Sequence, residues 1–219
     1  MAIDMTTGSP VKKMLAFSAP LIAGNILMQL SGFVDGLIVA RAAGVAAFAG
    51  VAAAAPVAFL ATGFLMGFAN GFLIPIALSV GAGDREALDR FACAALLMTA
   101  AMALLVAVPG ALLADRLIAL QGTPMDIAPR ALTYLRIQLL GVPVPLVFMT
   151  LSGIMRAGGD TRTPFRFQML AMALHLGLDV LLVVMLRLDV AGAALASVLS
   201  HGVACALFFR RVLRAHPGV

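Results

Sequence analysis

Charged side chains are scarce in this sequence, and their scarcity excludes a soluble globular fold. Asp, Glu, Lys and Arg make up 11% of the 219 residues, whereas 63% are hydrophobic. Ordinary soluble domains contain about 25% charged and about 45–50% apolar residues. A soluble chain of this length could not bury so much apolar surface, so we expect lipid to surround most of it.

Aromatic residues and cysteines are also few. Aromatic side chains form 6% of the chain, and its 15 Lys and Arg residues are scattered between apolar runs. This pattern excludes a nucleic-acid partner despite the net charge of +5. Cys93 and Cys205 lie inside apolar runs without metal-ligand spacing, so we interpret them as small buried side chains.

Motifs for catalysis and phosphate binding are missing as well. The chain lacks HExxH and GxSxG, which argues against an intramembrane enzyme. The loops "GAGDRE" and "AGGDTRTP" lack the spacing of phosphate-binding loops. We predict no catalytic residue and no cofactor, and we expect these loops to form turns and caps, with Thr163 capping a helix that starts at Pro164.

Six apolar stretches are each long enough to cross a bilayer, which takes about 20 residues of helix. The sequence therefore predicts an all-α membrane protein with a cytoplasmic N-terminal segment, a six-span transmembrane lobe and a basic cytoplasmic tail. The segment covers 1–13, the lobe 14–209 and the tail 210–219, with spans at about 14–40, 47–80, 91–114, 127–154, 164–187 and 190–209. The second and fourth spans are long and contain prolines and glycines, so we expect them to tilt, to kink or to include an interfacial turn.

Basic residues set the expected orientation. With the N-terminus inside, ten of the fifteen Lys and Arg residues fall on the inner side and five on the outer side. This is the sense of the positive-inside rule. We expect a multi-pass protein of the cytoplasmic membrane with both termini in the cytoplasm.

Two of the ten acidic residues, Asp35 and Asp179, lie well inside predicted spans. The helical rise puts them about 9 Å and about 12 Å below the outer ends of the first and fifth spans. Tyr134 and Ser197 fall in the same layer of the fourth and sixth spans, and His175 lies one turn from Asp179 on one helix face.

Ionisable groups inside a bilayer are costly and usually mark the path of an ion or substrate. We therefore predict that Asp35, Asp179, His175, Tyr134 and Ser197 form a cation- or proton-coupling site. The alternatives are that Tyr134 and Ser197 only join helices, and that His175 and Asp179 form an inert, internally hydrogen-bonded pair.

Five stretches in order carry a family resemblance: "VDGLIVARAAG", "GAGDRE", "ALTYLRIQLLGVPVP", "RAGGDTRTP" and "AGAALAS". From about Pro20 to about Ser200 the chain resembles the N-terminal half, one six-helix lobe, of a multidrug and toxin extrusion (MATE) transporter. The resemblance implies cation-coupled export of organic, often cationic, compounds by alternating access between two such lobes.

The resemblance also assigns residues. Asp35, Asp179 and Tyr134 match positions of the cation site in one branch of the family, and Ser197 stands where the family has a threonine. His175 stands where the family has an asparagine, so an amide oxygen that could hold Na⁺ is replaced by a group that titrates near neutrality. We expect H⁺ as the coupling ion, with Na⁺ at Asp35 and Asp179 as the alternative.

The family has about twelve helices, and six are found here. We expect either a piece of a longer protein or a half-size transporter that pairs with a second six-helix lobe or with its own copy. The expected partners are the lipid bilayer, a small organic substrate and that second lobe. The alternatives are an inactive fragment, a regulatory half-protein, or a flippase for lipid-linked cargo.

Overall fold

The computed structural model describes residues 10–215, without the side chains of residues 10–13, 16–17, 20 and 213–215. This part of the chain contains helices and turns but no strand, which confirms the all-α prediction. The helices are α1 (Pro10–Ala42), α2 (Val45–Gly71), α3 (Leu73–Ala82), α4 (Arg85–Leu112), α5 (Ala114–Leu120), α6 (Ala128–Gly141), α7 (Pro143–Ala157), α8 (Arg162–Asp179), the π-helix η1 (Val180–Met185) and α9 (Asp189–Ala215).

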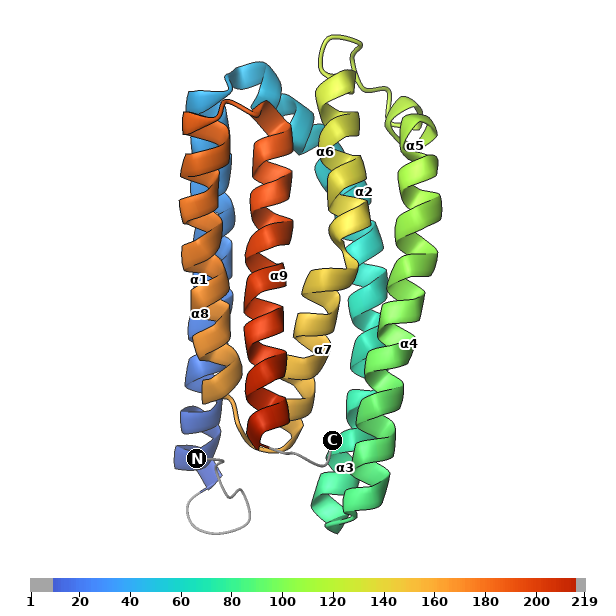
Figure 1. The fold of residues 1–219 in the computed structure, drawn as a ribbon, viewed down its shortest axis with the longest axis vertical. Helices are drawn as coiled ribbons and strands as arrows, with labels where there is room; N and C mark the ends of the chain where they lie inside the picture. Colours follow the sequence, from blue (N-terminus) through green and yellow to red (C-terminus); the bar gives the residue numbers. More distant parts are fainter. Residues whose placement is uncertain (1–9, 216–219) are drawn as a thin grey trace.

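The long helices run along one common axis (Figure 1). Helices α1, α8 and α9 lie on one side of the view, and α2, α4, α6 and α7 lie on the other. Helix α9 joins the two groups because it packs against α6, α7 and α8. Helix α1 begins and α9 ends at the same end of the bundle, as an even number of spans requires.

Five helical stretches are long and apolar enough to cross a membrane, and α6 with α7 makes a sixth if the bent pair is one span. The helices extend beyond two predicted limits. Helix α1 already begins at Pro10, and α9 continues to Ala215 because residues 210–215 are mostly strong helix formers. The rest of the predicted end segments, 1–9 and 216–219, lies outside the described residues.

Both long spans are interrupted near prolines. The fourth span, expected at 127–154, is two helices bent by 41° after Val142. Proline has no N–H and its ring crowds the carbonyl four residues earlier, so Pro143 and Pro145 interrupt the bonding of the preceding turn. In the second span the break at Phe72 lies three residues before Pro75 for the same reason, whereas α2 continues through Pro56.

Small residues fill the contacts between helices, and large apolar residues cover the outside. Ala47, Ala54 and Ala131 are fully buried, whereas Phe33 and Phe59 are 74% and 79% exposed. In a soluble helix bundle, the large apolar side chains are buried in the core and polar side chains cover the outside. Lipid tails solvate large apolar side chains, and small residues let membrane helices approach closely, so this distribution fits a transmembrane lobe.

In both loops, "GAGDRE" and "AGGDTRTP", an aspartate side chain accepts hydrogen bonds from backbone amides at the start of the next helix. Asp84 is the N-cap residue of α4, and Asp160 directly precedes Thr161, the N-cap residue of α8. Asp84 accepts a hydrogen bond from the Ala87 amide at the start of α4, at 3.0 Å. Asp160 accepts bonds from the amides of Arg162 and Thr163, each at 3.0 Å, and from the Thr163 hydroxyl at 2.6 Å. The prediction of Thr163 as the cap was wrong, because a carboxylate can accept all three donors at once.

Helix α6 lies closely against α9 at Gly141, and this contact is the basis of the first prediction. A Cβ built on Gly141 would lie 2.1 Å from a methyl carbon of Val198, whereas one on Gly67 meets nothing within 4 Å. We expect Gly141→Ala to destabilise the fold by about 1–3 kcal/mol through overpacking. The midpoint of thermal unfolding in detergent should fall by several degrees, and Gly67→Ala, the matched control, should leave it unchanged or raise it slightly.

Asp160 gives a second prediction. Partial burial raises the pKa of its carboxyl, but the hydrogen bonds from the Thr163 side chain and from the Thr163 and Arg162 amides outweigh it, so the pKa lies below 3.8. A lowered folded-state pKa stabilises the protein above the unfolded pKa, and the gain is lost as the pH falls through the folded value.

Asp160→Ala should therefore cost about 1 kcal/mol of stability at neutral pH, and the difference from wild type should narrow below pH 3.8. Thermal unfolding in detergent across this pH range measures both effects. Asp89→Ala, which removes an exposed carboxylate from the first turns of α4, serves as the control. An Asp160→Ala protein as stable as wild type at neutral pH would contradict the capping role.

Candidate cation-coupling site

Three titratable side chains meet where α1 packs against α8. Asp35 comes from α1, and His175 and Asp179 come from one face of α8, four residues apart. One nitrogen or oxygen of each residue can be chosen so that all three atoms lie within 4.8 Å of one another. The structure therefore brings together three of the five residues predicted from the sequence.

The cluster is buried and its polar atoms are not satisfied by the protein. Asp179 has no exposed surface, and the His175 side chain is 13% exposed. Both Asp179 oxygens, His175 Nε2 and Asp35 Oδ1 have no hydrogen-bond partner among the described residues. Buried polar groups without partners are expensive, so the cluster carries a desolvation cost that no hydrogen bond within the described residues offsets.

The contact between His175 and Asp179 is too long to make an inert pair. Nε2 of His175 lies 3.5 Å from Oδ2 of Asp179, beyond the usual range for an N–H···O bond. The interpretation of these two residues as an internally satisfied pair is therefore not supported.

Tyr134 on α6 lies beside the cluster. Its hydroxyl accepts a hydrogen bond from Gln138 Nε2 at 2.9 Å, and it lies within electrostatic range of both Asp35 and Asp179. Its ring packs against a buried apolar cluster that includes Val39 of α1. Gln138 was missed in the sequence, although it is a polar residue four positions after Tyr134 inside a predicted span.

Ser197 lies on α9 and is not one of the three residues of the cluster. Its backbone carbonyl accepts a bond from the Ser200 hydroxyl at 2.9 Å and lies 2.9 Å from Nδ1 of His201. Its own hydroxyl makes no hydrogen bond within residues 10–215, so its role in the site stays a prediction. His201, one turn further along α9, lies against the Phe148 ring and within electrostatic range of His175.

The helix that carries His175 and Asp179 changes its winding directly after them. Residues Val180–Met185 form a π-helix, a rare geometry that is frequent at functional sites. The following turn holds Arg187 and Asp189 in the left-handed region, with φ of 52° and 53°, which is strained for residues other than glycine. Gly192 permits this turn, because a Cβ there would lie 3.0 Å from the Leu182 backbone.

An ion pair joins two helices near this turn. Arg130 Nε donates to Asp189 Oδ2 at 2.8 Å and thereby joins α6 to the start of α9. Both side chains are about two-fifths exposed, at 40% and 38%, so the pair adds at most about 1 kcal/mol. A hollow of about 320 Å³ opens beside it, lined by Asp126, Thr133 and residues 188–191 among others.

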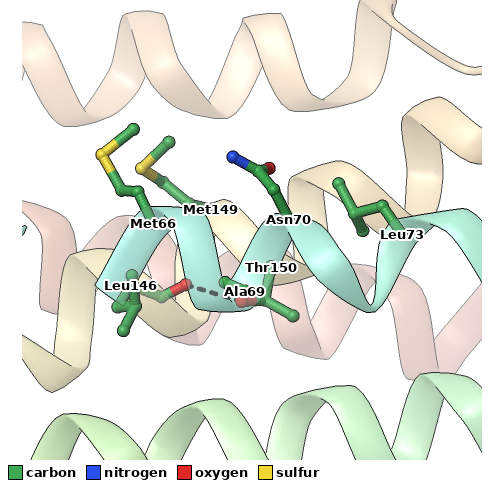
Figure 2. Close-up of a pocket in the computed structure, with 7 residues that line it drawn as sticks. All are labelled: Met66, Ala69, Asn70, Leu73, Leu146, Met149 and Thr150. Carbon is green, nitrogen blue, oxygen red and sulfur yellow. Dashed lines mark hydrogen bonds between the residues drawn. The ribbon is translucent and has the colours of Figure 1, made fainter. Parts of the chain in front are cut away.

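A second, much smaller cavity lies between α2, α3 and α7. Figure 2 shows Met66, Asn70 and Met149 around it, with Thr150 donating its hydroxyl to the Leu146 carbonyl at 3.0 Å. The cavity measures about 10 Å³, which is room for one water molecule at most. It is too small for an organic substrate.

Comparison with known proteins shows the family and the fold. A family model described as MatE matches residues 20–181. The probable multidrug resistance protein YpnP of Bacillus subtilis (strain 168) is 30% identical over 203 residues, which cover 93% of this chain and 46% of that protein.

Solved structures show the same lobe. A MOP superfamily transporter from Pyrococcus furiosus aligns with a TM-score of 0.85 and 26% identity, over 94% of this chain and 45% of its own. An outward-facing multidrug resistance MATE family transporter aligns with the same TM-score, the same identity and the same coverage of both chains. The chain thus spans less than half the length of the relatives it matches.

Proposed function

The chain belongs to the MATE family of membrane transporters, as the sequence motifs predicted, and we propose that it is one lobe of a cation-coupled antiporter. The proposed substrates are organic, often cationic, drugs or toxins, exported across the cytoplasmic membrane. The proposed coupling ion is H⁺. The observation that carries the proposal is the cluster of Asp35, His175 and Asp179 within 4.8 Å where α1 meets α8, with Asp179 fully buried and the other two partly buried.

The proposed coupling works through charge. Two ionised carboxylates this close in apolar surroundings repel each other, and burial makes each charge costly. Protons that enter from outside neutralise Asp35 and Asp179 and remove the repulsion between α1 and α8. The two helices can then pack differently, and the change in packing is coupled to release of the substrate.

His175 is proposed to adjust this step. A neutral imidazole can accept or donate a proton at Nε2, 3.5 Å from Asp179, whereas a protonated one would hold Asp179 ionised. Tyr134 and Gln138 lie beside the cluster, where they can orient a proton or water through their hydrogen bond.

A transporter with two lobes needs a partner for this chain. The proposed partner is a second six-helix lobe or a second copy of the chain. Because α1 begins and α9 ends at one end of the bundle, two copies inserted alike can pair about an axis along the membrane normal (Figure 1). Measuring the oligomeric state and ethidium efflux of the chain tests this, and a monomer without transport would favour the fragment or regulatory alternative.

The third prediction concerns the two carboxylates. Asp35→Asn and Asp179→Asn should each abolish proton-driven ethidium efflux from vesicles, because an amide cannot bind and release a proton. Both proteins should still insert into the membrane in normal amounts. Asp89→Asn, on the exposed start of α4, is the matched control and should transport normally.

Proton release from the purified chain tests the same residues without transport. Substrate added to wild type in weakly buffered detergent should release protons, and either Asn variant should release fewer. Full transport by both Asn variants would contradict the proposed mechanism.

The fourth prediction concerns the coupling ion. His175→Asn restores an amide oxygen beside the carboxylates, and Na⁺ prefers oxygen ligands to imidazole nitrogen. We expect efflux by this variant to respond to an imposed Na⁺ gradient at fixed pH, whereas wild type should not respond. A wild-type protein driven by Na⁺ alone would instead support the sodium alternative at Asp35 and Asp179.

A further inference from the structure

We propose that Asp35, His175 and Asp179 also bind one divalent transition-metal ion, with Zn²⁺ as the type, at the position where the coupling protons bind. Binding itself follows from the ligand set and its geometry. A second consequence, that the metal blocks transport, rests on the proposed function.

The donor atoms favour this class of metal. Alkali and alkaline-earth cations take shells of oxygen ligands, whereas imidazole nitrogen suits Zn²⁺, Cu²⁺, Ni²⁺ and Fe²⁺. His175 therefore changes the chemistry of a pair of carboxylates that would otherwise select a hard cation. Two carboxylates and one imidazole provide three protein ligands, and a metal with three protein ligands keeps a fourth position open for solvent.

The spacing is close to what a tetrahedral ion requires. Ligand atoms about 2.1 Å from a zinc ion lie roughly 3.4 Å from one another at tetrahedral angles. His175 Nε2 and Asp179 Oδ2 are already 3.5 Å apart. Asp35 offers an oxygen within 4.8 Å of a ring nitrogen of His175 and a carboxylate oxygen of Asp179, so small rotations of these side chains complete the triangle.

Charge balance distinguishes a divalent from a monovalent ion here. Asp179 has no exposed surface, and both of its oxygens are unpartnered among the described residues. One divalent ion neutralises both carboxylates, whereas one monovalent ion leaves a net negative charge buried between helices. Since an unbalanced charge inside a bilayer is expensive, the cluster should prefer the divalent ion.

Metal binding would fix the imidazole in one form. Nε2 must be unprotonated to bind the ion, so the remaining proton of His175 lies on Nδ1. His201 on α9 and Tyr134 on α6 are the other titratable groups within electrostatic range of the cluster. A bound metal would also tie α1 to α8, which is why it should compete with protons and stop the proposed cycle.

The test uses the purified chain in detergent, after removal of any affinity tag, and ZnCl₂ titrated against a chromogenic chelator. Wild type should bind one Zn²⁺ per chain. His175→Asn should weaken binding about tenfold or more. His201→Asn, the matched control, removes a neighbouring imidazole that is not a proposed ligand and should bind Zn²⁺ as wild type does.

Co²⁺ provides a second measurement, because its visible absorption depends on its ligands. The wild-type spectrum should show nitrogen and oxygen ligation, and His175→Asn should change it. A wild type that binds no Zn²⁺, or a His175→Asn variant that binds it unchanged, would overturn the proposal whatever the stability of the variants. Loss of binding in His201→Asn but not in His175→Asn would overturn it too.

Transport assays separate this proposal from the proposed function. Micromolar Zn²⁺ should inhibit efflux by wild type and inhibit the His175→Asn variant much less. If wild type binds no Zn²⁺ while Asp35→Asn still abolishes efflux, the metal site is wrong and the coupling role stands. If Zn²⁺ binds as expected while both Asn variants of the carboxylates transport normally, the metal site stands and the coupling role fails.

Discussion

A carboxylate without exposed surface, Asp179, sits between apolar helices, and the nearby structure is arranged around the cost of its charge. Asp35 approaches from α1 and adds a second acid, so the cluster can reach neutrality only by taking up protons or a cation. In our proposal, the imidazole of His175 selects between these two. Tyr134 and Gln138 add a polar edge on α6, and the rest of the surroundings is apolar.

Lipid as the surrounding solvent explains how such a cluster is held in place. No force in the bilayer drives large apolar residues inward, so alanines and glycines form the contacts between helices and allow them to approach closely. Gly141 against Val198 and Gly50 against Arg130 are examples of this close approach. Helices packed through small residues hold their polar side chains at fixed distances.

Much of the site could be predicted from the sequence because helical rise and period fix depth and face. Counting residues placed Asp35, Asp179, Tyr134 and Ser197 in one layer, with His175 one turn from Asp179. Proline chemistry pointed to irregular second and fourth spans, and the breaks lie at Phe72 and Val142. The rotation of α9, on which Ser197 lies, could not be predicted, because it depends on packing against several other helices. The π-helix has the sequence "VLLVVM", which reads as an ordinary apolar run. Neither the π-helix nor the left-handed turn after it could be recognised from the sequence.

Helix α8 has two unlike ends. At one end Asp160 accepts three hydrogen bonds, and Pro164 fixes the backbone of the first turn. At the other end the backbone widens into the π-helix and passes through two strained residues, Arg187 and Asp189. The helix is therefore stiff on one side of the cluster and compliant on the other. Under the proposed mechanism, ion uptake at His175 and Asp179 would displace mainly the end of α8 that leads to the Arg130–Asp189 ion pair, while the Asp160 loop holds the other end in place.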